Sequence, residues 1–247
     1  MLIAGRLCLI ALMLAPLAAY GGPPFNTDDP GIVEAGHVEL LPFHSSTRSA
    51  SGRAGVLAGL EAHFGATRRL EVDLTAPLAF ANVSGERAHE GYGDTTLAFK
   101  YKLQDESETT PLVSFVPRID FATGSVHHGL GNGGTQVLLA ASVQKTLDPF
   151  TAYMTAGYAV NDGAGNRSYP FAGVVIQREF GPHWTLGIEV FGNAATSTAL
   201  PSSVGFNAGG YYKLDEHGQL LFSAGRGLVH AARTDRVSTY VGYLYAF

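Results

Sequence analysis

The sequence has few of the features that stabilise most soluble or secreted domains. It contains one cysteine, Cys8, and only 15% of its 247 residues are charged, whereas soluble domains average about a quarter. Cys8 lies in an apolar N-terminal stretch, so the rest of the chain has no cysteine for a disulfide. No long apolar run follows that stretch, which excludes a transmembrane helix in the remainder.

Positive charge is also scarce, and this bears on partners. The formal net charge is −5, and we find neither a basic stripe nor a glycine-rich loop that would cradle phosphates. We therefore expect no nucleic-acid partner, no cofactor and no metal. No Gly-x-Ser-x-Gly sequence marks a hydrolase nucleophile, so we expect no catalytic residues.

The N-terminus has the pattern of a secretory signal. Arg6 supplies the positive charge, Leu7–Leu17 forms a short apolar region, and small residues follow at Ala18, Ala19 and Gly21. We expect residues 1–21 to be removed on export. Residues 22–36 are rich in Pro and Asp, which cannot pair well as a strand, and we expect them to form a lead in the periplasm.

The chain beyond this lead alternates between apolar and polar residues with a period of two, as β-strands do. The clearest run is Leu70–Phe80, in which every second residue is apolar: Leu70, Val72, Leu74, Ala76, Leu78 and Phe80. Twelve such runs are predicted, with longer loops after odd strands and short turns after even ones. Their approximate ranges are 37–45, 56–64, 70–80, 94–103, 112–122, 135–145, 151–160, 169–180, 184–192, 203–212, 219–228 and 237–247.

An even number of strands, few charges, 31 glycines, 14 phenylalanines and 11 tyrosines suit a sheet with one face in lipid. We predict an all-β fold, a closed antiparallel transmembrane barrel over residues 37–247, with both termini in the periplasm. Closure is required because hydrocarbon offers no partner to an unpaired strand edge. A soluble sandwich or lipocalin-like barrel would need a charged exterior, which this composition does not supply.

The last strand carries a second membrane signal. Val241, Tyr243, Tyr245 and Phe247 lie on one face, and the chain stops on the aromatic residue. This pattern resembles the terminal strand by which the barrel-assembly machinery recognises outer-membrane barrels for insertion. Further aromatic residues near strand ends are expected to form girdles at the two interfaces, among them Tyr92, Tyr101, Tyr153, Tyr211, Tyr212 and Trp184.

Charged residues fall mainly on the opposite face of the strands, which the fold directs into the lumen. Inside a membrane barrel such charges must face each other or water. Two interpretations stay open: a salt-bridge network that fills and stiffens the barrel, or a polar constriction that sets selectivity. The predicted lumen-lining residues are Glu61, His63, Glu71, Asp73, Asp94, Lys100, Lys102, Arg118, Asp120 and Glu189.

Several stretches resemble the family of outer-membrane transporter-like barrels named for the MetA pathway of phenol degradation. They are Pro24–Pro30, Val33–Glu39, Gly59–Gly65, Gly91–Leu97, Pro117–Gly124 and Gly225–Gly227. The resemblance implies passage of small, often aromatic or apolar, compounds across the outer membrane.

We therefore predict a passive channel for small molecules in the outer membrane of a Gram-negative bacterium, with outer-membrane lipid and a small-molecule solute as partners. Two alternatives remain. A lipid-modifying enzyme would need a nucleophile beside a histidine such as His63 or His127, and no paired outward Ser and His is found. A closed structural barrel without transport would have its inward charges meshed together.

Overall fold

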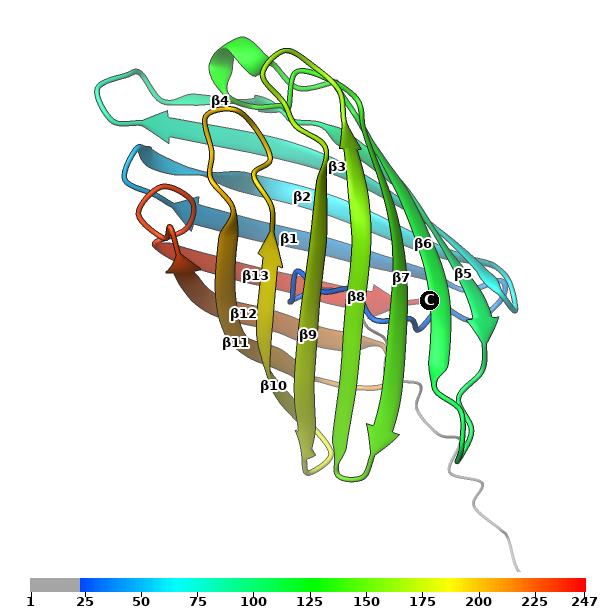
Figure 1. The fold of residues 1–247 in the computed structure, drawn as a ribbon. Helices are drawn as coiled ribbons and strands as arrows, with labels where there is room; N and C mark the ends of the chain where they lie inside the picture. The colour runs from blue at the N-terminus through cyan, green and yellow to red at the C-terminus, as the bar shows by residue number, and fades with distance from the viewer. Residues whose placement is uncertain (1–22) are drawn as a thin grey trace, which may run out of the picture.

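The structure, a computed structural model, describes residues 23–247. The predicted signal peptide, with Cys8, lies outside the described residues. Thirteen strands and one short 3₁₀ helix follow one another along the chain (Figure 1). They are β1 (Val38–Arg48), β2 (Gly52–Thr67), β3 (Leu70–Val83), β4 (His89–Tyr92), β5 (Thr95–Gln104), β6 (Leu112–Phe121), η1 (Val126–His128), β7 (Gln136–Leu147), β8 (Phe150–Asn161), β9 (Tyr169–Phe180), β10 (Trp184–Asn193), β11 (Ser203–Lys213), β12 (Gly218–Val229) and β13 (Val237–Ala246).

The strands form one closed antiparallel sheet. Each strand from β6 to β12 pairs with both of its sequence neighbours, β13 pairs with β1, β1 pairs with β2, and the β2–β3 pairing closes the ring. Strands β4 and β5 both pair with β3, one beyond the other, so they occupy a single position in the wall. The predicted closed barrel of twelve strands is therefore confirmed.

The break between β4 and β5 has a local cause. The N–H of Gly93 donates to the carbonyl of Pro77 at 2.9 Å, which still holds the chain against β3. Asp94 then turns away from the ladder, and its carboxylate accepts hydrogen bonds from the N–H groups of Gly124 at 2.8 Å and Asn132 at 2.6 Å. The predicted strand therefore begins at Thr95, and Asp94 anchors the loop after β6.

The two faces of the barrel are arranged as lipid requires. Large apolar side chains lie exposed on the outer face, while polar and charged residues such as Glu71, Lys100 and Glu189 are buried inside. This is the reverse of a soluble domain and matches a wall in contact with hydrocarbon. The exposed set includes Leu60, Phe64, Leu74, Leu78, Phe115, Leu139, Met154, Val174, Ile176, Ile188, Val190 and Val241.

The predicted aromatic girdles are found only in part. Tyr92, Tyr101 and Trp184 are exposed near strand ends, as predicted. Tyr153 is not a girdle residue, because its side chain points into the lumen and packs with Phe25. Period-two alternation decides this: Tyr153 shares a face with buried Thr155, whereas its neighbour Met154 faces outward.

The loops differ between the two ends of the barrel. We call the end that carries residues 38 and 246 the terminal end, since Glu39 pairs with Ala246, and the other the loop end. Turns at the terminal end are short, and the longer connections lie at the loop end (Figure 1). The first loop-end connection is shorter than predicted, because β1 and β2 extend to residues 48 and 52. In the described residues no helix is long and apolar enough to cross a membrane.

Pro117 lies within β6, where a proline favours a bulge or a local irregularity. The register between β5 and β6 is the same at the Ala98–Arg118 pair and at the Tyr101–Phe115 pair, and the pairs between them are missing, so the proline causes a local irregularity without a bulge. Proline has no N–H to donate, so the hydrogen bond that it cannot make is missing on one side of the strand only, the side that faces β5. On the other side Pro117 still lies opposite Leu139 of β7.

Candidate functional site: the lumen and its N-terminal plug

The segment before β1 lies inside the barrel, in contrast to the periplasmic lead that we predicted from the sequence (Figure 1). The hydroxyl of Ser223 donates to the carbonyl of Pro24 at 2.6 Å, and that of Ser114 donates to the carbonyl of Pro30 at 2.6 Å. These two serines come from opposite parts of the wall, β12 and β6. We call residues 23–33 the N-terminal plug.

The composition of the plug explains why it can be held this way. Proline cannot donate a backbone hydrogen bond, so a segment with Pro23, Pro24 and Pro30 offers mainly acceptors. Inward serine and threonine hydroxyls supply the matching donors, including Thr155, which donates to the carbonyl of Asp28. The backbone of the plug is thereby satisfied by wall side chains rather than by secondary structure.

Glu189 of β10 makes the most concentrated contact with the plug. Its side chain is fully buried. One carboxylate oxygen accepts from the N–H of Thr27 at 2.6 Å and from its hydroxyl at 2.7 Å. The other oxygen accepts from the side-chain amide of Asn207 at 2.6 Å. Hydrogen bonds to an ionised acceptor are stronger than neutral ones, so Glu189 fixes the first half of the plug.

Lys100 of β5 fixes the second half. Its ammonium lies 3.0 Å from a carboxylate oxygen of Asp28 in the plug and 3.8 Å from Glu71 of β3. Glu71 in turn accepts a hydrogen bond from the N–H of Val33. Lys100 and Glu71 each expose only 3% of their surface, so the plug completes an ion pair that is shielded from water.

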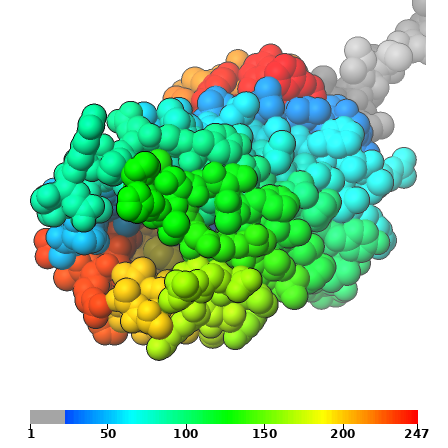
Figure 2. All heavy atoms as spheres, turned by 90° about the horizontal axis from the view of Figure 1, so that it is seen from above, coloured from blue at the N-terminus to red at the C-terminus, as the bar shows by residue number. Residues whose placement is uncertain are grey.

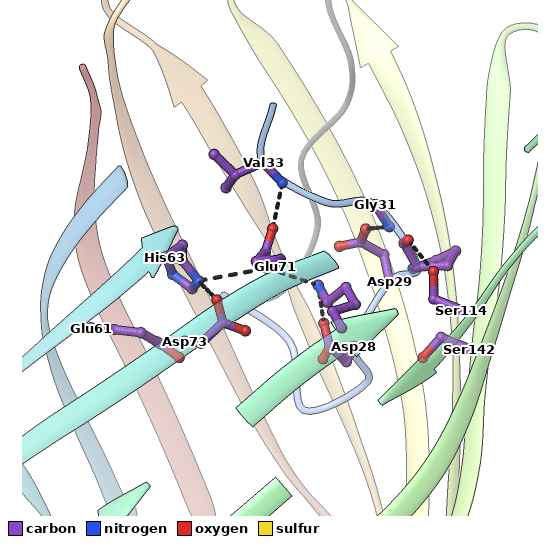
Figure 3. A network of polar contacts seen from close by, with 12 residues as sticks. Asp28, Asp29, Gly31, Val33, Glu61, His63, Glu71, Asp73, Ser114 and Ser142 are labelled. Carbon is purple, nitrogen blue, oxygen red and sulfur yellow. Dashed lines mark hydrogen bonds and ion pairs between the residues drawn. The ribbon is translucent and has the colours of Figure 1, made fainter. Parts of the chain in front are cut away.

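The ion-pair network extends to His63 on β2. Its Nδ1 lies 2.9 Å from Asp73 and 3.9 Å from Glu71 (Figure 3). Glu61 lies next along the strand and accepts from Thr75 at 3.2 Å. His63, Glu71 and Asp73 offer ligand atoms within 4.8 Å of one another, but the histidine and Lys100 already engage these carboxylates. The cluster is therefore complete as a protein network and needs no metal.

The plug packs closely against one side of the wall. A cavity of about 20 Å³ lies between the plug and the wall there, lined among others by Gly31, Val33, His63 and Glu71. That volume has room for about one water molecule. The plug and the side chains that bind it therefore occupy this part of the terminal half of the lumen.

Asp29 is the most deeply buried acid of the plug. One carboxylate oxygen accepts from the N–H of Gly31 at 2.6 Å, while the other has no hydrogen-bond partner among the described residues. Burial raises the pKa of Asp29 to about 7, and the nearby Lys100 ammonium offsets this rise only in part. The plug thus carries one carboxyl that takes up a proton in the docked state.

The predicted lumen residues fall into four places. Glu61, His63, Glu71, Asp73, Lys100 and Glu189 surround the plug. Arg118 and Asp120 lie beside each other at 3.2 Å in the loop half of the lumen. Lys102 pairs with Asp105 at 2.6 Å at the terminal rim, and Asp94 anchors a loop as described above.

Aromatic side chains line the lumen beyond the plug, and sequence reasoning missed them. Phe43, Phe171 and Phe191 are half-buried and share strand faces with buried inward residues. Tyr240 of β13 stacks on Phe43 with ring centroids 5.6 Å apart. The loop half of the lumen therefore combines these aromatic rings with polar side chains, among them Gln136, Asn161, Asn193 and the Arg118–Asp120 pair.

Each of the three phenylalanines lies directly opposite a glycine on the adjacent strand, and a Cβ at that glycine would collide with the ring. The pairs are Phe43 with Gly59, Phe171 with Gly157, and Phe191 with Gly205. Because glycine has no side chain, the ring can lie along the wall instead of standing across the lumen. The arrangement gives this part of the lumen wall three flat apolar surfaces.

The loop end is hollowed. Figure 2 shows an opening between the loops around residues 194–202 and 230–236, seen from the loop end. The lumen therefore has one half that opens at the loop end and carries the phenylalanine rings, and another half that holds the plug.

A closed antiparallel barrel with an apolar outer face and a polar, occupied interior defines the class of outer-membrane β-barrels. The family described as "Putative MetA-pathway of phenol degradation" matches residues 45–241. Since the match covers more than half of the chain, the protein belongs to this family. The plug lies before the matched residues. No curated protein matches the sequence.

Solved structures show the same fold. The COG4313 outer membrane channel from Pseudomonas putida F1 is similar over 88% of this chain and 97% of that chain, with a TM-score of 0.69 and 17% identity. NanC porin is similar over 83% of this chain and 98% of that chain, with a TM-score of 0.60 and 7% identity. KdgM porin is similar over 85% and 99%, with a TM-score of 0.59 and 11% identity. At these identities the likeness concerns the fold.

Proposed function

We propose that the protein is a passive channel for small apolar or aromatic molecules in the outer membrane of a Gram-negative bacterium. The observation that carries this proposal is the aromatic lining of the loop half of the lumen, where three phenylalanine rings lie flat over glycines. Flat rings offer an apolar solute stacking contacts without blocking its path. The similar fold of channels and porins, together with the family match, supports the proposal.

The orientation that we propose places both termini in the periplasm and the longer loops outside the cell. Barrels of this class have short periplasmic turns and longer extracellular loops, and the terminal end carries the short turns here. An export signal in residues 1–21 is consistent with this location. Val241, Tyr245 and Phe247 are exposed on the outer face of the last strand, where the barrel-assembly machinery would meet them.

The plug makes a closed barrel the second candidate. Its hydrogen bonds and ion pairs span the terminal half of the lumen, and the free space beside it holds about one water molecule. In the channel proposal this is the resting state, and a solute passes only when the plug moves. In the alternative, the plug never moves and the barrel carries no solute.

An enzymatic function has less support. His63 is held between carboxylates, 2.9 Å from Asp73 and 3.9 Å from Glu71. These partners can orient the imidazole and its proton, but they supply no nucleophile for it to activate. His127 and His128 lie at the loop end, where the ring of His128 stacks on His89 at 4.3 Å. A channel also fits the porins of similar fold.

Uptake by whole cells tests the proposal, since the lipopolysaccharide leaflet is the barrier that such a channel bypasses. Cells of a Gram-negative host would express the wild type, a Phe171→Ala/Phe191→Ala variant, or a Phe115→Ala/Phe121→Ala control that removes two rings from the outer face. Uptake of radiolabelled naphthalene and of a radiolabelled disaccharide would be followed. Equal amounts of folded barrel in each membrane would be verified by heat-modifiable gel mobility.

We expect the wild type to speed naphthalene uptake but not disaccharide uptake. Each lumen ring contributes about 0.5–1.5 kcal/mol of stacking, so the inner double variant should lose several-fold in rate while the outer control keeps it. If cells with the wild-type barrel take up naphthalene no faster than cells with an empty vector, the closed structural barrel is the better description.

A further inference from the structure

Three arginines gather at the loop end on the outer face of the barrel, where β13, β1 and β2 lie side by side. Arg48 is the last residue of β1 and lies directly opposite Arg53 of β2. Arg236 immediately precedes β13, and its N–H donates to the carbonyl of Arg48 at 2.6 Å. All three side chains are exposed.

Strand register shows that Arg48 and Arg53 face away from the lumen. Arg48 pairs with Val237, which shares its strand face with the exposed Val241. Arg53 lies opposite Asn82, on the same face of β3 as Phe80, and its guanidinium sits 5.6 Å from the Phe80 ring. These two arginines are therefore at the level where the apolar outer face ends and lipid headgroups begin, and Arg236 lines the hollow beside them.

The protein supplies no counter-charge at this place. Among residues 23–247, none of the three arginines forms an ion pair with a carboxylate. Like charges directly opposite on adjacent strands are destabilising, so the Arg48–Arg53 pair has a cost that the fold does not offset. At the terminal rim, in contrast, Lys102 and Lys145 are paired with Asp105 and Glu106.

The arginines surround a hollow that suits an oxyanion. Its volume is about 280 Å³, and it is lined by Arg48, Arg53 and Arg236 together with Ser49, Ala50, Gly52, Asn82 and Ser84. Arg53 is oriented by a hydrogen bond from its Nε to the hydroxyl of Ser46 at 2.5 Å. A guanidinium has five donors and binds phosphate with two at once, so most donors of the cluster remain for a ligand.

We propose that this hollow binds the phosphate groups of lipopolysaccharide in the outer leaflet. Because guanidinium groups donate several hydrogen bonds, the hollow suits an anion with several oxygens. Because the hollow faces outward at the membrane boundary, we infer that this anion is anchored in the lipid. The inference rests on the orientation proposed above, with the loop end outside the cell. It does not depend on whether the barrel conducts a solute.

Binding of defined lipids to the purified, folded barrel in detergent tests the inference by native mass spectrometry. The probes are diphosphoryl lipid A, dephosphorylated lipid A with the same acyl chains, phosphatidylglycerol and inorganic phosphate. The variants are R48Q/R53Q/R236Q and, as a matched control at the opposite rim, R178Q. A R48K/R53K/R236K variant keeps the charge but loses the two-donor geometry.

We expect diphosphoryl lipid A to bind the wild type and R178Q equally. Loss of the three arginines should weaken binding by about fivefold for each charge, about a hundredfold together, and the lysine variant should lie between. Dephosphorylated lipid A should bind all variants weakly. If the glutamine variant does not fold, two comparisons still test the inference. The lysine variant must bind diphosphoryl lipid A more weakly than the wild type does. The wild type must bind dephosphorylated lipid A more weakly than diphosphoryl lipid A.

Three results would overturn the inference. Equal binding of both lipid A forms to the wild type would show that phosphate is not recognised. Inorganic phosphate binding as tightly as lipid A would mark a site for soluble anions. Phosphatidylglycerol binding as tightly as diphosphoryl lipid A would remove the assignment to the outer leaflet.

Discussion

The two halves of the lumen are built on opposite principles. In the terminal half, buried charges from several strands converge on the plug, and the contacts are specific, directional and shielded from water. In the loop half, phenylalanine rings lie along the wall over glycines, and the contacts that they offer are apolar and non-directional. The first arrangement holds one partner in one position, while the second accepts a range of small molecules.

The comparison teaches that the inward charges have a partner within the chain. Buried ion pairs add little net stability, but removal of one member leaves an uncompensated charge. The plug supplies Asp28 as the ion-pair partner of Lys100. Release of the plug would leave Lys100 without this partner, which makes the plug hard to displace. The predictions below test this contrast between a tightly specified half and a permissive one.

The largest effect is expected from Lys100→Met. The change leaves the buried Glu71 and the half-buried Asp28 without their shared cation, which costs about 3–5 kcal/mol in docking of the plug. Deuterium exchange of residues 23–33 should accelerate by more than a hundredfold, measured by mass spectrometry. Lys145→Met is the matched control, because its pair with Glu106 lies at the rim and is worth about 0–1 kcal/mol. Equal exchange in both variants would contradict a plug held by Lys100.

Glu189→Gln should have the next largest effect. The substitution keeps the shape but removes the charge that accepts two hydrogen bonds from Thr27 and one from Asn207. Loss of charge-assisted bonding costs about 2 kcal/mol, so exchange should accelerate in the first half of the plug more than near Val33. Uniform acceleration along residues 23–33 would show instead that the plug moves as one unit.

Asp29 should make docking depend on pH. Burial raises its pKa to about 7 in the docked plug, against 3.8 for an ordinary aspartate. The docked state therefore holds a proton that the released state has lost, and docking weakens as pH rises from about 4 to 7, by up to tenfold per pH unit. Above about pH 7 both states are ionised and the dependence stops.

Asp29→Asn supplies the control for this prediction. The amide cannot ionise, so the ratio of wild-type to variant exchange in residues 23–33 should rise between pH 5 and pH 7 by roughly tenfold per unit and then level off. Taking the ratio at each pH cancels the intrinsic pH dependence of exchange. A flat ratio would mean that Asp29 stays ionised in the docked plug.

Much of the wall was predictable, because lipid imposes a rule that is local in sequence. Alternation with a period of two must hold along every strand that has one face in hydrocarbon, as in Leu70–Phe80. The same rule placed Glu71 and Lys100 inside the barrel, where the structure has them. The alternating aromatic residues at the end of the chain likewise indicated the terminal strand.

The plug was not predictable from local pattern. A segment with several prolines and no alternation is correctly read as non-strand, but nothing near Thr27 indicates that its partner is Glu189, which lies 162 residues away. The aromatic lining escaped for a related reason. Phe171 and Gly157 are ordinary alone, and only the register between β8 and β9 places the ring over the glycine. Register depends on the closed sheet as a whole.

The smallest effect concerns one ring and its glycine in the loop half. In Gly205→Ala the new Cβ would lie 2.7 Å from the ring of Phe191, so the ring must leave the wall at a cost of about 1 kcal/mol. Phe191→Ala removes the ring, and in the double variant the alanine at 205 meets no ring. Urea unfolding of the four proteins in lipid gives the coupling free energy. We expect the double variant to be less destabilised than the sum of the single ones. If the effects of the two single substitutions on stability are additive, Gly205 does not accommodate the Phe191 ring. The flat position of the ring would then have another cause.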